Sequence, residues 1–315
     1  MSLKNNNLNK ARKEKNDEFY TLYNDIEKEL IFYKNHFNGK IVYCNCDDPT
    51  KSNFVNYFVN NFNELNLKSL IATSFSNENN GLLYEFDGKN LPKITKLQGN
   101  GDFRSEECIN LLKKSDIIVT NPPFSLFREY IDIMMKFDKK FLVIGNTNAI
   151  ANKEFFPLIK DNKLWLGCSS FNTGMYFEVP ENYVHNETYK FKKEIDGKKV
   201  MRVAAICWFT NLEHNRRNNF LNLTCQYSED KYPKYDNYDA IEVSKVCEIP
   251  MDYEGVMGVP ITFIDKFNPE QFEIVGWSRH NDMNMDGGYW LGGKNDATIN
   301  GKDVYCRILI KHKKI

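Results

Sequence analysis

Four consecutive residues, Asn121-Pro122-Pro123-Phe124, have the groups needed to hold a planar amine. The prolines fix the backbone and remove two N–H donors, while their carbonyl oxygens can still accept hydrogen bonds. An amine held by the Asn121 side-chain oxygen and the Pro122 carbonyl oxygen loses its ring conjugation, so its lone pair can attack a methyl sulfonium. The Phe124 ring offers a face for an extruded base. These residues predict methyl transfer to a planar amine without a covalent enzyme intermediate.

A second motif, Cys46-Asp47-Asp48-Pro49, is an acidic turn that suits the amino group of the methionine part of S-adenosylmethionine. An ordinary turn with an aspartate helix cap is the alternative interpretation. The chain has no Gly-x-Gly-x-x-Gly motif, which disfavours a dinucleotide cofactor.

A third motif is the glycine-rich turn 99–103, which contains Asp102 and Phe103. Asp102 can accept a hydrogen bond from the amino group of an adenine, and Phe103 can stack on its ring. The glycines of the turn allow a close approach of the backbone. A turn of this composition is common in proteins. Its position at the end of a strand of the same sheet favours a role in binding.

The elements that must position these motifs alternate between strand and helix patterns. The expected strands of the sheet are 40–44, 69–73, 116–120 and 141–145. The expected helices are a run from about 17 to 37, residues 52–63, residues 105–114, and one of about 13 residues after the Asn121 motif. This alternation predicts an α/β fold, with a mostly parallel, doubly wound sheet and helices on both of its faces. Ligands bind at the carboxyl ends of such strands, which is where all three motifs fall.

Other elements are expected outside this alternation. Residues 82–86 and 93–97 are predicted to form a hairpin, and strand-like runs dominate after about residue 160, at 164–168, 174–179, 201–210, 271–277 and 304–310. We therefore expect a basic flexible arm (1–16), a catalytic domain (17–213) and a smaller C-terminal α+β region (214–315).

Charge alone does not indicate a nucleic-acid binder, because 42 Lys and Arg balance 42 Asp and Glu. Basic residues are nevertheless clustered in places where they can contact DNA phosphates. The candidates are Lys10, Arg12, Lys13, Lys15, Lys192, Lys193, Arg216 and Arg217. Solvated tails and loops are the alternative interpretation of such clusters.

Apolar runs, the N-terminal segment and the cysteines argue against a membrane protein, a secreted protein and a zinc protein. No apolar run approaches the roughly 20 residues of a membrane span, and the N-terminus has no secretory signal pattern. The 8 cysteines are scattered without zinc-site spacing, so we expect free thiols in the cytoplasm and no metal site.

An ordered series of motifs resembles the EcoRI-type family of adenine-specific DNA methyltransferases over nearly the whole chain. The matching segments are residues 17–21, 43–49, 101–105, 121–127, 207–212, 255–263 and 304–310. The resemblance implies a class I (Rossmann-like) methyltransferase fold, S-adenosylmethionine as cofactor, a flipped adenine in double-stranded DNA as substrate and a C-terminal target-recognition region. It implies that Phe19, Tyr20 and Thr21 help to hold the cofactor, and that Asp102 and Phe103 hold its adenine.

The resemblance also implies a site-specific enzyme that protects DNA, in a restriction-modification system or in a phage and its host, and that acts as a monomer. A restriction endonuclease acting on the same sequence is then a functional partner, not a physical one. One departure concerns the ribose: such folds usually place an acid at the end of the second strand, whereas residues 71–77 contain none before Glu78. Three functions remain open on the residues alone: a DNA adenine methyltransferase, an RNA adenine or protein-glutamine methyltransferase, and a catalytically inactive DNA-binding relative.

Overall fold

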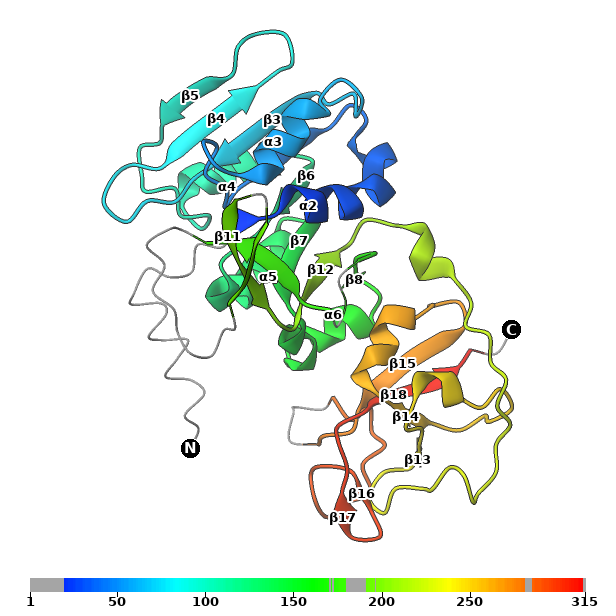
Figure 1. Ribbon diagram of the computed structural model, residues 1–315. Helices are drawn as coiled ribbons and strands as arrows, with labels where there is room; N and C mark the ends of the chain where they lie inside the picture. The colour runs from blue at the N-terminus through cyan, green and yellow to red at the C-terminus, as the bar shows by residue number, and fades with distance from the viewer. Residues whose placement is uncertain are drawn as a thin grey trace. The chain divides into compact units, whose positions relative to one another are not determined.

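The computed structural model describes residues 20–169, 171, 173–179, 191–195, 197–280 and 285–313. The chain forms two compact units (Figure 1). The first consists of the residues up to Thr147 together with Leu166–Leu212, and the second of Asn148–Trp165 together with the residues from Glu213. The chain therefore passes into the second unit, returns to the first, and passes into the second again.

An eight-stranded sheet has the order β5-β4-β3-β2-β6-β7-β12-β8. Its strands are β2 (Ile41–Cys44), β3 (Ser69–Thr73), β4 (Leu82–Phe86), β5 (Lys93–Lys96), β6 (Ile117–Thr120), β7 (Lys140–Asn146), β8 (Trp165–Leu166) and β12 (Ile206–Thr210). The four central strands β3, β2, β6 and β7 are parallel, whereas β4, β5 and β12 pair antiparallel. The predicted parallel strands and the hairpin are confirmed, but the whole sheet is mixed and not mostly parallel.

Helices cover both faces of this sheet. Val42 and Cys44 of β2 share a core with α2 (Tyr23–Leu30), the 3-10 helix η1 (Ile31–Phe37) and α3 (Asn53–Asn60). Tyr43 points to the opposite face, because successive side chains alternate along a strand, and there it meets Cys108 of α4 (Glu106–Lys114). On that face α5 (Phe127–Lys136) lies against β7, where Phe127 leaves no room for a side chain on Gly145.

Local sequence signals explain where these helices begin. The Ser52 hydroxyl accepts a hydrogen bond from Phe54 N at 3.1 Å, and the Ser105 hydroxyl accepts one from Cys108 N at 3.3 Å. Each serine thereby satisfies a backbone donor that the first turn of a helix leaves unpaired. The helix expected after the Asn121 motif begins as the 3-10 turn η2 (Phe124–Leu126) and continues as α5.

A four-stranded antiparallel sheet completes the first unit, in the order β1-β9-β11-β10. Its strands are β1 (Tyr20–Thr21), β9 (Met175–Glu178), β10 (Phe191–Ile195) and β11 (Lys198–Val203). The predicted single strand 201–210 is wrong, because the chain breaks between β11 and β12 and the two strands join different sheets. Ala205 causes the break: its φ of 57° is a left-handed conformation that a strand does not adopt.

The second unit has its own sheet, in the order β13-β14-β18-β15. Its strands are β13 (Ile241–Glu242), β14 (Met257–Val259), β15 (Phe272–Trp277) and β18 (Ile308–His312), beside the hairpin β16 (Thr298–Ile299) and β17 (Lys302–Asp303). Helix α6 (Phe156–Lys160) packs on β15 through Phe156 and Trp277, whose ring centroids are 5.6 Å apart. The 3-10 helices of this part of the chain are η3 (Thr147–Ala151), η4 (Asn215–Asn218), η5 (Val246–Glu248) and η6 (Ile261–Lys266).

None of the helices among the described residues is both long and apolar enough to span a bilayer. All 8 cysteines belong to the described residues, and none of them is joined in a disulfide.

Candidate functional site

A cavity of about 630 Å³ opens in the first unit, at the carboxyl ends of the parallel strands β2, β3 and β6. Its volume falls within the roughly 300–1,000 Å³ of small-molecule sites. The predicted residues that line it are Tyr20, Thr21, Cys46, Asp47, Asp48, Asp102, Phe103, Asn121, Pro122, Pro123 and Phe124. Pro49 is not among the lining residues, and Phe19 lies outside the described residues. Three motifs far apart in the sequence therefore meet in one cavity.

The cavity also contains residues that the sequence analysis did not select. They are Asn45, Lys51, Ser52, Asn53, Ser74, Phe75, Ser76, Asn77, Glu78, Asn79, Gly101, Arg104, Ser125 and Leu126. Most of them directly follow a predicted strand or adjoin a selected motif. That position is the sequence feature from which they could have been identified as part of the site. Hydroxyl and amide side chains at such positions are too common in turns to be selected by type alone.

Asp47 ties the ends of three strands together. Its carboxylate accepts hydrogen bonds from the Ser52 hydroxyl at 2.7 Å and from the Thr120 hydroxyl of β6. Its backbone N–H donates to the Thr73 carbonyl of β3 at 3.1 Å. Burial raises the pKa of Asp47 to about 6, and the two hydroxyl donors limit the rise. The site thus holds a desolvated carboxyl group that faces the cavity and is poised for a cationic partner.

Its neighbours in the same turn are arranged differently. Asp48 Oδ1 accepts from the backbone N–H of Thr50 at 2.9 Å and from the Thr50 hydroxyl at 2.7 Å, which fixes the turn. Burial, reinforced by Asp47, raises the pKa of the Cys46 thiol well above its ordinary value. The thiol is therefore neutral near pH 7 and is a poor nucleophile.

The Asn121 motif forms the rigid exit from β6. Pro122 is buried, and the Pro123 carbonyl accepts a hydrogen bond from Leu126 N at 2.9 Å, which closes the turn into η2. The Phe124 ring contacts Phe177 of β9 edge-on, with centroids 6.0 Å apart. The motif is therefore held from both sides while Asn121 lines the cavity.

Thr21 presents a buried hydroxyl group to the same cavity. The side chain is buried, and its Oγ1 atom has no hydrogen-bond partner among the described residues. Asn53 of α3 holds the Thr21 backbone by donating to its carbonyl at 2.8 Å. A buried hydroxyl without a partner costs free energy, and a bound polar ligand can recover that cost.

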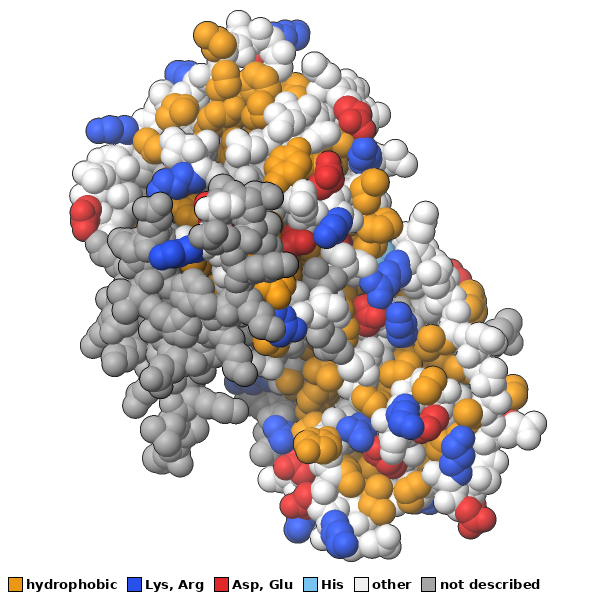
Figure 2. Space-filling view, viewed as in Figure 1, with side chains coloured by type: hydrophobic (Ala, Val, Ile, Leu, Met, Phe, Trp, Pro, Cys, Tyr) orange, Lys and Arg blue, Asp and Glu red, His pale blue; other side chains and the backbone are white. Residues whose placement is uncertain are grey.

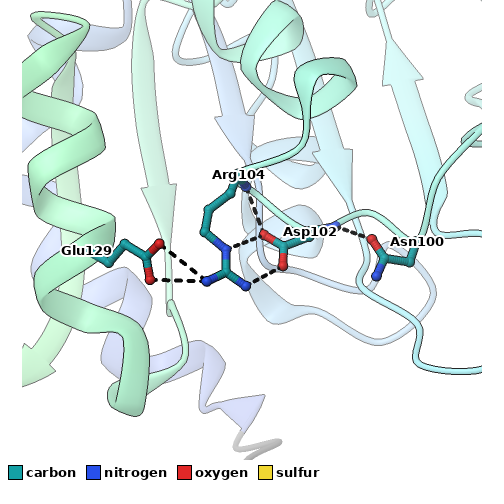
Figure 3. Close-up of polar contacts among 4 residues, drawn as sticks. All are labelled: Asn100, Asp102, Arg104 and Glu129. Atoms are coloured by element: carbon teal, nitrogen blue, oxygen red, sulfur yellow. Dashed lines mark hydrogen bonds and ion pairs between the residues drawn. The ribbon is translucent and has the colours of Figure 1, made fainter.

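Asp102 is clamped by Arg104 (Figure 3). Arg104 Nε and Nη2 donate to the two carboxylate oxygens at 2.8 and 2.6 Å, and Arg104 Nη1 reaches Glu129 of α5 at 3.1 Å. The hydrogen bonds from Arg104 hold the pKa of Asp102 below its ordinary value. Asp102 N donates to Asn100 Oδ1 at 3.1 Å. The carboxylate is thus kept ionised and fixed in direction at the cavity wall.

Phe103 is a largely buried member of the cavity lining. Its side chain is only 5% exposed. The ring contacts Tyr130 edge-on at 5.1 Å, and the Arg104 guanidinium lies over it at 5.4 Å. Phe103 therefore lines the cavity while most of its ring packs against the protein itself.

The predicted DNA-contacting residues divide into three groups. Lys10, Arg12, Lys13 and Lys15 lie outside the described residues, and Lys192 and Lys193 belong to β10, where only the backbone is described. Arg216 Nη2 donates to both carboxylate oxygens of Asp265, at 2.7 and 2.6 Å.

Arg217 needs a correction, because it is 7% exposed. It lies 3.6 Å over the Trp165 ring and donates to Glu213 and Asn162. These contacts fix Arg217 within the second unit and leave no exposed guanidinium for a phosphate. On the face drawn in Figure 2, Lys and Arg side chains are scattered among acidic ones and do not form one continuous patch.

Comparisons with known proteins identify the family of the chain. Residues 7–313 match the family described as adenine-specific methyltransferase EcoRI. The chain is 50% identical to the type II methyltransferase M.EcoRI of Escherichia coli, over 98% of this chain and 97% of the relative. It is 43% identical to M.MgeORF184P of Mycoplasma genitalium (98% and 99%) and 42% identical to M.MpnI of Mycoplasma pneumoniae (97% and 98%), both type II methyltransferases. No solved structure matches the chain.

The family match covers the cavity, both units and every motif that the sequence analysis quoted. The chain therefore belongs to the EcoRI family of adenine-specific DNA methyltransferases.

Proposed function

We propose that this protein transfers a methyl group from S-adenosylmethionine directly to the exocyclic amino group of an adenine that is flipped out of double-stranded DNA. Family membership makes it a type II adenine-specific DNA methyltransferase. The observation that carries the finer proposal is the single cavity shared by the Asn121 motif and the acidic turns at Asp47 and Asp102. The functional partner we propose is a restriction endonuclease that cuts the same sequence.

The architecture supports a class I, Rossmann-like methyltransferase fold for the first unit. Its four central strands are parallel, helices cover both faces, and the cavity opens where those strands end. Ligands in open α/β sheets bind at that edge. Every residue lining the cavity belongs to the first unit, so one chain supplies the whole site and we propose that the enzyme works as a monomer.

The residues of the cavity fit S-adenosylmethionine. Asp47 and Asp48 would hold the ammonium end, because a desolvated carboxylate gains most from a cation. The unpartnered Thr21 hydroxyl and the adjacent Tyr20 would face the ligand, with Phe19 preceding them in the chain. Asp102, kept ionised by Arg104, would accept from the adenine amino group. The cofactor supplies an electrophilic methyl group on a positively charged sulfur.

The Asn121 motif would act on the other reactant. The Asn121 side-chain oxygen and the Pro122 carbonyl each accept one N–H of the target amine, so the nitrogen lone pair is no longer delocalised into the ring. Phe124 stacks on the flipped base, and its edge contact with Phe177 fixes the ring that the base would meet. The S–C bond would break as the N–C bond forms, with the neutral thioether of S-adenosylhomocysteine as the leaving group, and the surplus proton would pass from the methylated amine to solvent. The neutral Cys46 thiol takes no part as a nucleophile in this scheme.

The second unit is our candidate for target recognition. It comprises residues 148–165 and the residues from 213, so it includes a segment that the sequence analysis assigned to the catalytic domain. Lys10, Arg12, Lys13 and Lys15 supply four cations in the N-terminal arm, and Lys192 and Lys193 supply two more. We propose that these residues contact DNA phosphates, whose neutralisation dominates affinity for DNA.

A methyl-transfer assay with labelled S-adenosylmethionine tests the proposal. Unmethylated duplex DNA, transfer RNA and a mixture of proteins are offered separately, and the modified base is located by sequencing DNA from cells that express the protein. We expect label in duplex DNA alone, as N6-methyladenine within one short sequence. Incorporation into RNA or protein but not into DNA would overturn the assignment, and incorporation into none of the three would identify an inactive relative.

A further inference from the structure

Residues 287–293, which lie between β15 and β16 in the second unit, form a loop with a pair of glycines at each end. We call it the tip loop. All four glycines have a positive φ, between 65° and 109°. A Cβ on the first of them, Gly287, would lie 2.2 Å from the Val275 carbonyl of β15, so the base of the loop packs closely on the sheet. A Cβ on any of the other three would meet nothing within 4 Å, so the rest of the loop borders open space.

Leu291 lies in the tip loop with its side chain 65% exposed. A single exposed leucine is ordinary on a protein surface, but the backbone of this one is firmly held. Leu291 N donates to the Asn237 carbonyl at 2.9 Å. The preceding ring, Trp290, stacks on His280 with centroids 3.6 Å apart and planes 10° apart. Trp290 Nε1 also donates to the Lys294 carbonyl at 3.1 Å, which closes the loop behind Leu291.

Asn237 joins the tip loop to the segment that follows it. Its side chain is buried, and its Nδ2 atom donates to the carbonyls of Lys294 and Asp296 at 2.7 and 2.8 Å. Its Oδ1 atom accepts from Thr298 N at 2.9 Å. A buried network therefore fixes the loop before any ligand arrives. Because a side chain on a fixed backbone loses little conformational freedom on binding, an apolar contact with Leu291 is favourable.

Cationic side chains border the tip loop. The Lys311 ammonium lies over the Tyr289 ring at 5.0 Å. Lys294 pairs with Asp303 at 2.9 Å, and both of these side chains are more than half exposed. Exposed ion pairs contribute little stability, so the Lys294 ammonium can exchange its carboxylate partner for a phosphate. The loop thus presents an apolar side chain between cations.

Duplex DNA fits this arrangement. Its phosphates attract the cations, and its base edges accept apolar contacts from a side chain that enters a groove. The family acts on adenine in DNA, and every residue that lines the cavity belongs to the first unit. That cavity accommodates one base beside the cofactor, so the neighbouring base pairs must be read by residues outside it.

We propose that the tip loop reads the sequence of the target DNA, and that Leu291 enters a groove and packs against the edges of one or two adjacent base pairs. This inference rests on the proposed function, because it assumes that the second unit contacts the target. It makes Leu291 a residue that determines specificity and takes no part in methyl transfer itself.

Fluorescence anisotropy with S-adenosylhomocysteine present tests the proposal. Affinity is measured for a duplex that contains the methylated sequence and for duplexes that carry each single base-pair substitution of it. Leu291→Ala removes most of the apolar contact, so affinity for the methylated sequence should fall about 5- to 30-fold. A wrong base pair costs the unmodified protein about 5- to 150-fold. In Leu291→Ala this cost should shrink to less than about threefold at one or two adjacent positions and persist at the others.

Two further variants complete the comparison. Leu291→Met retains an apolar side chain of similar volume, so its discrimination should stay within about twofold of that of the unmodified protein. The matched control is Leu91→Ala, because Leu91 is 92% exposed in the turn between β4 and β5 of the first unit and lies outside the cavity lining. This control should reproduce the unmodified profile at every position.

The inference is overturned if Leu291→Ala discriminates normally at every base pair. It is also overturned by an equal loss on all duplexes, including one without the methylated sequence, or by a loss in Leu291→Met as large as that in Leu291→Ala. Methylation of one short DNA sequence by the unmodified protein separates these failures from failure of the proposed function. If that protein methylates DNA while Leu291→Ala discriminates normally, only the role of the tip loop is wrong.

Discussion

Arg104 grips Asp102 with a planar fork and at the same time reaches Glu129 on α5 (Figure 3). Helix α5 follows the 3-10 turn that begins at Phe124, so one guanidinium connects the turn that contains Asp102 to the helix that extends the Asn121 motif. The two loops proposed to hold the two reactants are therefore joined by a single side chain.

Substituting Arg104→Gln should weaken binding of S-adenosylhomocysteine about tenfold, as measured by calorimetry. The change removes a bidentate, charge-assisted contact and leaves Asp102 free to turn away from the cavity. Arg104→Lys should give an intermediate affinity, because lysine retains the charge but not the fork. Arg279→Gln is the control: Arg279 pairs with Asp296 at 2.6 Å and is 41% exposed, against 39% for Arg104. Equal affinities for Arg104→Gln and the unmodified protein would show that binding does not depend on the contact between Arg104 and Asp102.

Asn121→Ala should abolish methyl transfer while binding of S-adenosylhomocysteine stays within about twofold. Asn121 is proposed to hold the amine of the base and not the sulfonium, so the loss should appear in kcat and exceed about a hundredfold. Single-turnover transfer to duplex DNA, with calorimetry on the same preparation, measures both quantities. A variant that transfers methyl groups normally but binds the cofactor weakly would mean that the roles of the two loops are exchanged.

Asp47→Asn should stabilise the protein at pH 8 and weaken cofactor binding. The pKa of Asp47 is raised to about 6 in the folded state, against about 3.9 in an unfolded chain, so folding disfavours its ionised form. Ionised Asp47 therefore lowers the free energy of unfolding. This loss grows as the pH rises from about 4 to 6, and above that range it is at most about 3 kcal/mol.

Urea denaturation of both proteins at pH 4 and pH 8 measures this effect. The gain in the free energy of unfolding of Asp47→Asn should be present at pH 8 and nearly absent at pH 4. A difference that does not change with pH would show that Asp47 is solvated and titrates normally.

Gly101→Ala should lower the free energy of unfolding by about 2–4 kcal/mol, whereas Gly99→Ala should change it by less than about 1 kcal/mol. Gly101 has a φ of 80°, and its Cβ would meet the Ser74 carbonyl, so strain and overlap add. At Gly99 a Cβ meets nothing within 4 Å. Similar losses in both variants would mean that the contact between loops 74–76 and 99–103 contributes little.

Deleting residues 1–15 should flatten the salt dependence of DNA binding. The segment carries Lys10, Arg12, Lys13 and Lys15, and each phosphate neutralised adds about 0.9 to the slope of log K against log salt. If all four residues contact phosphates, the magnitude of the slope should fall by roughly 3 to 4. The measurement is a fluorescence anisotropy titration at several salt concentrations. A slope equal to that of the full chain would exclude the arm from the DNA interface.

Much of the site could be predicted from the sequence, because each motif directly follows a strand. Asp47 follows β2 and Asn121 follows β6, and parallel strands bring their carboxyl ends to the same edge of a sheet. Serine caps and buried strand patterns are local signals, so the helices after Ser52 and Ser105 were also predictable. The family could be identified because its motifs occur in one order along the chain.

The sequence by itself therefore determined the family and most of the predicted residues that line the cavity, through local patterns and motif order. Only the tertiary structure decided which groups surround them, because those contacts join residues far apart in the chain. Packing buried the ring of Phe103 and left Phe75 exposed, although both residues line the same cavity. Arg217 packs against the Trp165 ring and is buried there. The left-handed backbone of Ala205 divides an apparently continuous strand between two sheets. Exposure and sheet membership depend on neighbours in space, and no pattern of residue types along one segment specifies them.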